Sequence, residues 1–133
     1  MTMNTTTQTT AATMVADARN TIDNLPVDQV AVELATGQPL LVDIREAEEL
    51  SATGKIDGAV HAPRGMLEFY ADPASPYHQP EYDPNRRVIL YCASSGRSAL
   101  AVKTLQALGY RDIAHLDGGI KAWTAAGQPL EPA

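Results

Sequence analysis

The single cysteine of the chain is the residue whose surroundings most clearly allow chemistry. Cys92 follows an apolar run, residues 88–91, and precedes the small residues Ala-Ser-Ser-Gly at positions 93–96. Small side chains leave the backbone N–H groups of such a segment free to turn toward an anion, and a helix that begins at about Arg97 adds the positive end of its dipole. An electropositive, partly open environment of this kind stabilises a thiolate, the nucleophilic form of cysteine. We therefore predict that Cys92 is a nucleophile.

The neighbours of Cys92 leave several alternatives open. Arg97 could bind an incoming oxyanion through its planar guanidinium, or it could hold the loop in place. The hydroxyls of Ser94, Ser95 and Ser98 could supply a serine nucleophile, although no histidine or carboxylate lies nearby in sequence to act as a base. A cysteine at the end of an apolar strand could also be a small buried side chain without chemistry. The Ser-Ser-Gly-Arg loop favours the reactive thiol over both alternatives.

These residues need a strand and a helix to position them, and the periodicity of the sequence predicts both. Strands are predicted over residues 39–44, within 54–63, over 87–91 and over 113–116, and helices over 14–22, 26–36, 45–50, 66–70, 97–108 and 120–126. Strands that alternate with helices indicate an α/β domain with a mainly parallel central sheet, flanked by helices on both faces. Gly109 is expected to end the helix before it in a left-handed conformation.

The carboxyl ends of parallel strands are where ligand sites gather in open α/β sheets, and Cys92 lies at such an end. Asp43 and Arg45 lie at the end of another predicted strand, with both side chains on one face if the strand persists. We expect them to lie close to the catalytic loop and to support the site. An ion pair or hydrogen bonds that fix neighbouring loops are favoured for them over direct catalysis.

The composition excludes several classes of function. A formal charge of -6 leaves no basic surface for nucleic acid, and no apolar run is long enough to span a membrane. A lone cysteine excludes an intramolecular disulfide, so we predict a cytoplasmic protein. The histidines at positions 61, 78 and 115 lack metal-ligand spacing, which predicts no metal site and ordinary structural or surface roles for His61, His78 and His115.

Two segments are predicted to lack regular structure. The threonine-rich residues 1–13 lack the features of a signal peptide and are expected to be a disordered tail, which leaves residues 14–133 as a single domain. Residues 71–86 carry four prolines and form a long loop. This loop, with the tyrosines in and beside it, could be a lid, a protein contact surface or a solvated insertion.

Four segments, taken in order, resemble the single-domain rhodanese-like sulfurtransferases. They are LVDIR at 41–45, GKIDGAVHAP at 54–63, CASSGRS at 92–98 and DGGIKAW at 117–123. The resemblance implies a rhodanese-like fold and an enzyme, similar to thiosulfate sulfurtransferase, in which Cys92 takes a sulfane sulfur from a donor such as thiosulfate as a persulfide. It implies that the loop holds this persulfide and that the sulfur then passes to cyanide, a thiol or a sulfur-relay protein, with no cofactor and no metal. The loop residues concerned are Ala93, Ser94, Ser95, Gly96, Arg97 and Ser98.

Loop length separates this family from a related phosphatase branch, whose loop is one residue longer between cysteine and arginine. Four residues lie between Cys92 and Arg97, which favours sulfur over phosphate or arsenate as the cargo. Lys55 stands where the family commonly has a histidine, and no basic residue lies between Cys92 and Gly96, unlike the loops of some thiosulfate-preferring members. The donor is therefore open. A persulfide-carrying or redox-sensing module without turnover is the alternative function.

Overall fold

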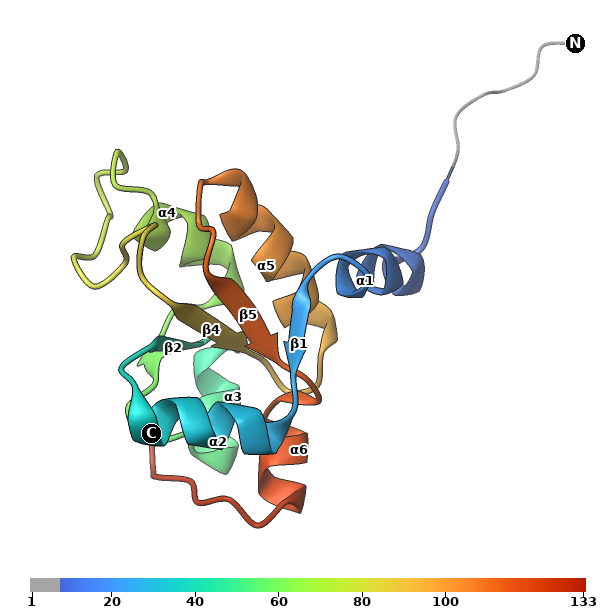
Figure 1. Cartoon of the computed structure of the whole chain (residues 1–133), viewed down its shortest axis with the longest axis vertical. Helices are drawn as coiled ribbons and strands as arrows, with labels where there is room; N and C mark the ends of the chain where they lie inside the picture. The colour runs from blue at the N-terminus through green and yellow to red at the C-terminus, as the bar shows by residue number, and fades with distance from the viewer. Residues whose placement is uncertain (1–7) are drawn as a thin grey trace, which may run out of the picture.

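A five-stranded parallel sheet forms the centre of the molecule. The structure, a computed structural model, describes residues 8–133. The strands are β1 Asp23–Leu25, β2 Leu40–Asp43, β3 Val60–His61, β4 Val88–Tyr91 and β5 Ile113–Leu116. They lie in the order β1-β5-β4-β2-β3, and every neighbouring pair is parallel (Figure 1). The prediction of a mainly parallel sheet is confirmed.

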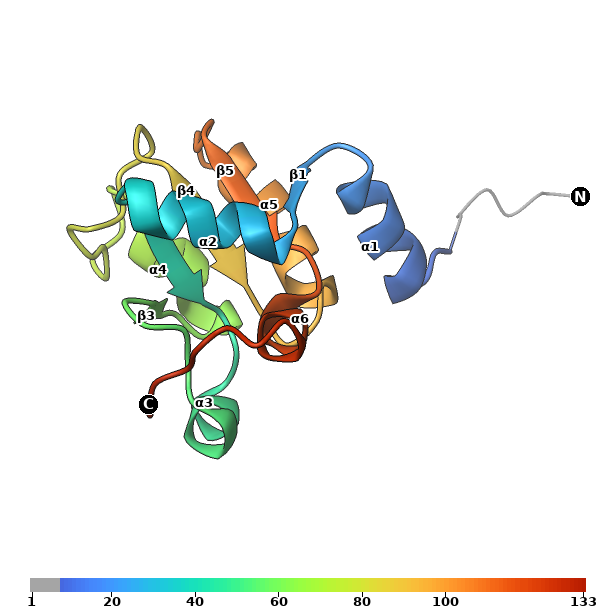
Figure 2. The ribbon, with the colours of Figure 1, turned by 60° about the horizontal axis from the view of Figure 1, so that its bottom comes forward.

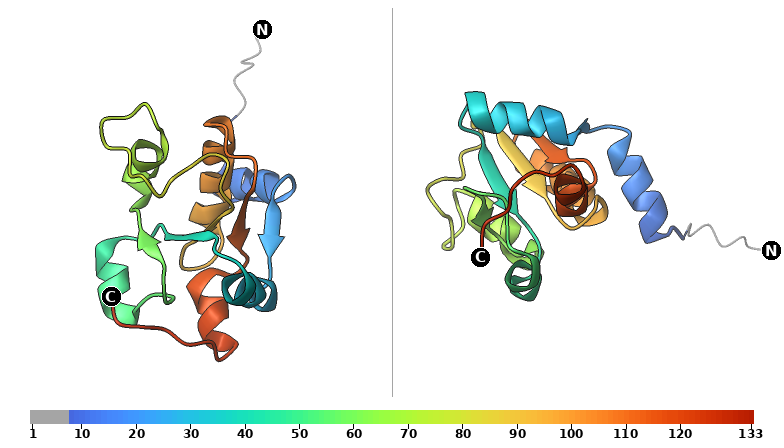
Figure 3. Two further views of the ribbon diagram at one scale, coloured as in Figure 1. Left: turned by 60° about the vertical axis from the view of Figure 1, so that its left-hand side comes forward. Right: turned by 90° about the horizontal axis from the view of Figure 1, so that it is seen from below.

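Helices cover both faces of this sheet, as predicted. They are α1 Ala11–Arg19, α2 Val27–Thr36, α3 Ala47–Thr53, α4 Leu67–Ala71 after the 3-10 turn η1 Arg64–Met66, α5 Gly96–Ala107 and α6 Gly119–Ala125. Helices α4 and α5 pack on one face, while α2 and α6 pack on the other (Figure 3). Helix α1 lies beside α5, near the edge that carries β1 (Figure 2).

The central strands are buried on both sides, which explains their almost continuous apolar sequence. On β4, Val88 and Leu90 join the cluster beneath α5, whereas Ile89 and Tyr91 join the cluster beneath α2 and α6. Successive side chains of a strand point to opposite faces. Cys92 continues this alternation and belongs to the α5 face.

The first helix begins earlier than the sequence predicted. Helix α1 starts at Ala11 rather than Met14, because the hydroxyl of Thr10 caps it by accepting a hydrogen bond from the backbone N–H of Thr13 at 3.1 Å. Residues 11–13 are therefore helical and not part of a disordered tail. The rest of the prediction of disorder falls mainly on residues 1–7, which lie outside the described residues.

Strand β1 was missed entirely by the sequence analysis. Its sequence, Asp-Asn-Leu, has neither the length nor the apolar content of a typical strand. Pairing with β5 defines it instead, with Asn24 in register with His115. Because side chains in register on neighbouring strands share a face, this pairing brings Asn24 beside His115.

Helix α3 begins two residues later than predicted, at Ala47 rather than Arg45. The side chain of Glu49 accepts a hydrogen bond from the backbone N–H of Glu46 at 2.9 Å, which fixes the start of the helix after Arg45. Arg45 therefore lies in the turn between β2 and α3. From there its side chain reaches back to the end of β2.

The proline-rich segment between α4 and β4 carries no helix or strand, as predicted. Tyr82 anchors it through a side chain that is only 1 % exposed, whereas Tyr77 stands out and packs edge-on against Phe69. At the other end of the chain, the segment after α6 returns to α3, where Lys55 and Glu131 form a β-bridge (Figure 3). None of the helices within residues 8–133 has the length and apolar character needed to cross a membrane.

Candidate active site

Cys92 lies directly after β4, at the carboxyl end of the sheet, as predicted. Its residue surface is only 1 % exposed, so the partly open environment expected for the thiol is not found. The reason is that successive side chains of β4 alternate between the two faces of the sheet. The side chain of Cys92 falls on the face covered by α5 and joins the core cluster there. Ser94, at the outer side of the loop, is exposed. Cys92 is thus buried beneath the loop, whereas Ser94 is open to solvent.

The loop after Cys92 is held by its carbonyl groups. The carbonyl of Cys92 accepts a hydrogen bond from the backbone N–H of Ile120 at 2.9 Å, and that of Ala93 accepts one from Lys121 at 3.1 Å. In the described part of the chain, the N–H groups of Ala93, Ser94 and Ser95 have no hydrogen-bond partner. The first turn of α5 follows at once. The loop therefore offers backbone donors and a helix N-terminus to an anion.

The glycine pair before α6 allows this arrangement. Gly118 and Gly119 have φ values of 84° and 60°, in the left-handed region that favours glycine. A Cβ atom on Gly119 would stand 2.4 Å from the carbonyl oxygens of both Cys92 and Ser94. From the sequence, this pair counted only as part of the DGGIKAW segment that resembles the family. Gly119 therefore allows the close approach of α6 to the loop after Cys92.

Ser95 links the loop to the turn before α6. Its Oγ accepts a hydrogen bond from the backbone N–H of Gly118 at 2.8 Å and donates one to Oδ1 of Asp117 at 3.2 Å. Asp117 also pairs with Arg19 of α1 at 2.9 Å, which lowers the pKa of this carboxyl. The hydroxyl of Ser95 is thus engaged in holding the loop.

Arg97 of α5 forms a two-bond pair with Glu49 of α3. The distances are 2.8 Å from Nη1 to Oε2 and 2.9 Å from Nη2 to Oε1. The hydrogen bond from Arg97 lowers the pKa of Glu49 to about 2, and the same bond raises the pKa of Arg97. The guanidinium thus ties the start of α5 to α3.

Asp43 and Arg45 form the predicted ion pair. Nη2 of Arg45 lies 2.7 Å from Oδ2 of Asp43, and the two side chains are 1 % and 0 % exposed. Their position differs from the prediction, because Asp43 is in register with Tyr91, whose side chain points to the face opposite Cys92. Arg45 instead binds the end of α3, through the carbonyl of Gly54 at 2.8 Å and the hydroxyl of Thr53 at 2.8 Å. The pair therefore steadies the helix that carries Glu49.

A buried polar chain beneath Cys92 was missed by the sequence analysis. Oγ of Ser98 lies 3.5 Å from Sγ of Cys92 and 2.7 Å from Nδ1 of His115, and Nε2 of His115 lies 2.6 Å from Oδ1 of Asn24. Burial, with a contribution from Arg19, lowers the pKa of His115 to about 4, so the imidazole is neutral near pH 7.

No spacing in the sequence links these polar residues, and the strand that carries Asn24 was not predicted. His115 is fully buried, as a structural histidine would be, and its ring lies against Ser98 of α5. Ser98 is also fully buried, so its hydroxyl does not face a substrate.

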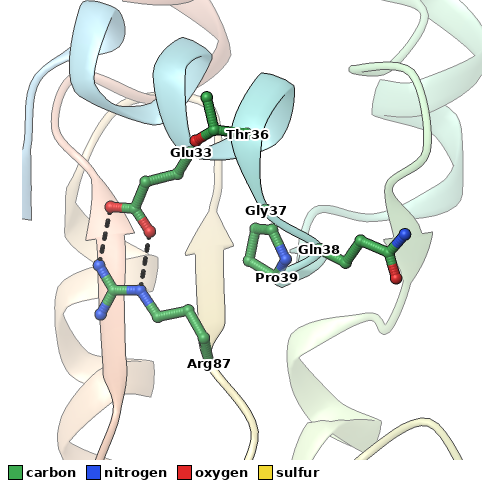
Figure 4. A pocket seen from close by; sticks show the side chains of 6 residues that line it. All are labelled: Glu33, Thr36, Gly37, Gln38, Pro39 and Arg87. Atoms are coloured by element: carbon green, nitrogen blue, oxygen red, sulfur yellow. Dashed lines mark hydrogen bonds and ion pairs between the residues drawn. The ribbon is translucent and has the colours of Figure 1, made fainter.

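The remaining candidates lie away from Cys92. Nζ of Lys55 pairs with Glu131 at 2.6 Å, and Nε2 of His61 lies 2.6 Å from the carbonyl oxygen of Arg45. Among residues 8–133, no three His, Cys, Asp or Glu side chains gather as a metal site. A hollow lined in part by Glu33, Pro39 and Arg87 lies at the opposite, amino end of the sheet (Figure 4).

Comparison with known proteins assigns the fold and this loop to one family. The sequence profile described as "Rhodanese-like domain" matches residues 26–126. The chain belongs to the rhodanese-like domain family. Among curated rhodanese relatives, a protein named sulfurtransferase from Allochromatium vinosum is 34% identical over 111 residues, which is 84% of this chain and 94% of the relative. The resemblance deduced from the four sequence segments is confirmed.

Solved structures extend this comparison. A protein of unknown function from Rhodopseudomonas palustris, described as a possible tyrosine phosphatase, is 37% identical with a TM-score of 0.88, over 98% of this chain and 100% of the other. The polysulfide-sulfur transferase homodimer from Wolinella succinogenes is 30% identical with a TM-score of 0.72, over 90% and 85% of the two chains.

Proposed function

We propose that this rhodanese-like chain is a sulfurtransferase that carries sulfane sulfur on Cys92 as a persulfide. The observation that carries the proposal is the loop after Cys92, whose carbonyl groups are tied to α6 while three of its N–H groups have no partner within residues 8–133. Donors fixed in this way stabilise an anion without having to reorganise. The anions concerned are the Cys92 thiolate and the persulfide that it forms.

The reaction consists of two displacements at sulfur. The thiolate of Cys92 attacks the outer sulfur of a donor such as thiosulfate, a new S–S bond forms at Sγ, and the old S–S bond breaks as sulfite leaves with its electron pair. An acceptor such as cyanide or a thiolate then attacks the outer sulfur of the persulfide, and the Cys92 thiolate leaves. Neither displacement requires a metal or an organic cofactor.

The other residues of the site would act on the loop. The amides of Ala93, Ser94 and Ser95, with the first turn of α5, would hold the persulfide. Arg97, paired with Glu49, would keep the start of α5 in place and add positive charge near the sulfur. Asp43 and Arg45 would support the site through α3.

The relatives support sulfur over phosphate, although one of them is described as a possible tyrosine phosphatase. Two features of this chain argue against the phosphatase alternative. The interval from Cys92 to Arg97 holds four residues, a narrower loop than the related phosphatase branch has. The guanidinium of Arg97 is also occupied by a carboxylate, which competes with any phosphate for its donors.

The physiological partners follow from the chemistry as proposals. The donor would be a small sulfane compound, and the acceptor a thiol, cyanide or a protein of a sulfur relay. A reducing compartment such as the cytoplasm would keep Cys92 free of competing oxidation.

Thiocyanate release tests the proposal. The full chain is mixed with thiosulfate and cyanide, and we expect many thiocyanate molecules per protein molecule, with none from the Cys92→Ser variant. One equivalent alone would indicate a sulfur-carrying module without turnover. Hydrolysis of an aryl phosphate that depends on Cys92, without thiocyanate release, would overturn the proposal in favour of a phosphatase.

A further inference from the structure

The polar chain Cys92–Ser98–His115–Asn24, whose first three members are buried, joins four secondary structure elements. Cys92 follows β4, Ser98 lies on α5, His115 on β5 and Asn24 on β1. Ser98 and His115 are 0 % exposed and Cys92 is 1 % exposed, so water does not compete for their hydrogen bonds. The proposed sulfur chemistry uses only the first member of this chain.

Asn24 determines which nitrogen of His115 carries a hydrogen. Its Nδ2 donates hydrogen bonds to the carbonyl oxygens of Arg19 at 2.9 Å and Ile22 at 3.2 Å. Because carbonyl oxygens only accept, the amide of Asn24 must present Oδ1 to His115. Nε2 of His115, 2.6 Å away, therefore carries a hydrogen and donates it.

The neutral imidazole then leaves Nδ1 as an acceptor, and this decides the direction of the Ser98 hydroxyl. Ser98 has one hydrogen, and it goes to Nδ1 of His115 at 2.7 Å. The other acceptor within reach, the carbonyl oxygen of Ser95, is 3.4 Å away and makes a much longer contact. Toward Sγ of Cys92 the hydroxyl therefore presents a lone pair.

A lone pair at this position can accept a hydrogen bond from the Cys92 thiol but cannot donate one to the thiolate. We propose that His115 is a positioning residue that, through the Ser98 hydroxyl, favours the thiol form of Cys92 and opposes the thiolate that the loop amides favour. The inference rests on the proposed role of Cys92 as the reacting group. It assigns His115 a control over the reactivity of that group, exerted through the Ser98 hydroxyl.

The charged groups around this polar chain cannot account for the expected change in the reactivity of Cys92. Arg19 of α1 and Asp117, which follows β5, act on His115, and they neutralise each other in an ion pair 2.9 Å long. Arg97 of α5 acts on Cys92 and is paired with Glu49 of α3. All four groups stay in place when only the acceptor of His115 is removed.

His115→Gln removes this acceptor and little else. The glutamine amide nitrogen takes the place of Nε2 and can still donate to Asn24, whereas no acceptor remains at the place of Nδ1. The freed Ser98 hydroxyl can then turn to the sulfur. A hydrogen bond to a charged group changes an equilibrium constant by about tenfold or more. We therefore expect Cys92 to react with iodoacetamide about tenfold faster near pH 6 than in the unsubstituted protein.

Two further variants show whether the effect passes through Ser98. His115→Asn places an amide oxygen near the position of Nδ1 and should bring the alkylation rate near pH 6 back toward that of the unsubstituted protein. In a Ser98→Ala background, His115→Gln should add no further acceleration. An equal or slower alkylation of the His115→Gln protein, or an acceleration that persists without the Ser98 hydroxyl, would overturn the inference.

A measurement on the unsubstituted protein keeps the test independent of how well the variants fold. The ¹⁵N chemical shifts of His115 between about pH 6 and pH 8 should show a hydrogen on Nε2 and none on Nδ1. A hydrogen on Nδ1 would contradict the inference. Neither alkylation nor these shifts need a sulfur donor, so a protein without sulfurtransferase activity would sink the proposed function and leave this test intact.

Discussion

At each end of the sheet, an arginine forms two hydrogen bonds with a glutamate. At the amino end Arg87 binds Glu33 of α2, with both distances 3.0 Å (Figure 4). At the carboxyl end Arg97 binds Glu49 at 2.8 and 2.9 Å. The amino-end pair is the more buried, with side chains 24% and 21% exposed against 39% and 33%. A two-bond arginine–glutamate pair is therefore not what distinguishes the candidate site.

The difference lies in the backbone and in the groups beneath it. At the carboxyl end the pair adjoins a cysteine, three loop N–H groups with no partner in residues 8–133, and a buried histidine. At the amino end Arg87 has a second carboxylate, Asp112 at 3.0 Å, and the hollow beside it is lined by neither cysteine nor histidine. The proposed chemistry therefore belongs to the carboxyl end, whereas the ion pairs at the amino end stabilise the fold.

The largest difference between the two ends is expected when one glycine at each end is replaced by alanine. Gly119→Ala forces a Cβ atom to within 2.4 Å of two loop carbonyl oxygens. We therefore expect the free energy of unfolding to fall by about 3 kcal/mol and most of the thiocyanate activity to be lost. Gly109, near the amino end, has φ 100° and no atom within 4 Å of the added Cβ. Gly109→Ala should cost only about 1–2 kcal/mol and leave activity intact. Urea unfolding and initial rates measure both, and equal effects on activity would refute the contrast.

The buried histidine predicts a stability loss in mild acid. Burial holds the pKa of His115 at about 4, below its ordinary value of 6.5, so between these values the unfolded chain binds more protons than the folded one. The neutral state of His115 therefore costs no stability above pH 6.5. As the pH falls toward 4, the free energy of unfolding decreases by up to about 3 kcal/mol. Urea unfolding between pH 7 and 4 measures it. The His115→Gln protein should lack this part of the decline, and an unchanged decline would place its cause elsewhere.

Matched substitutions of the two arginines come next in size. Arg97→Gln should lower the rate of sulfur transfer about tenfold, because the start of α5 loses its tie to α3, while costing less than about 1 kcal/mol of stability. Arg87→Gln should cost about 1–2 kcal/mol, because Glu33 and Asp112 both lose their partner, and leave the rate unchanged. Unfolding curves and thiocyanate rates on both proteins test this, and a reversed pattern would contradict it.

The smallest effect is expected from the acid titration of Glu49. Its pKa is lowered from 4.5 to about 2 by the bond to Arg97, so its contribution to stability is present above pH 4.5 and disappears as the pH falls toward 2. Glu49 is one-third exposed, with 33% of its side chain accessible, and solvent screening keeps this contribution below about 1 kcal/mol. The difference in unfolding free energy between Glu49→Gln and the unsubstituted protein should therefore shrink from pH 6 to pH 3. A constant difference would exclude the pair as its source.

Much of this fold was predictable because its central strands carry strong local signals. The apolar runs at β2, β4 and β5 are buried on both faces, and their periodicity differs clearly from that of α2 and α5. Strand β1 was missed because edge pairing, not composition, defines it. The start of α1 was misplaced because a threonine cap decided it, and Ala11 and Ala12 gave no signal of their own.

The site was predictable only where it is continuous in sequence. Cys92 and its loop could be recognised because strand, loop and helix follow one another. His115 and Asn24 could not, since only the sheet order brings them to Ser98. The burial of Cys92 was also not foreseen, because it depends on which face of β4 the residue after Tyr91 takes.

The mass of Cys92 after exposure to a sulfane donor tests the central claim most directly. The protein is incubated with thiosulfate, then with a polysulfide in a separate sample, and the peptide that contains Cys92 is analysed by mass spectrometry. We predict a gain of one sulfur atom on Cys92 that disappears when cyanide is added. A Cys92 that gains no sulfur from either donor would contradict the account.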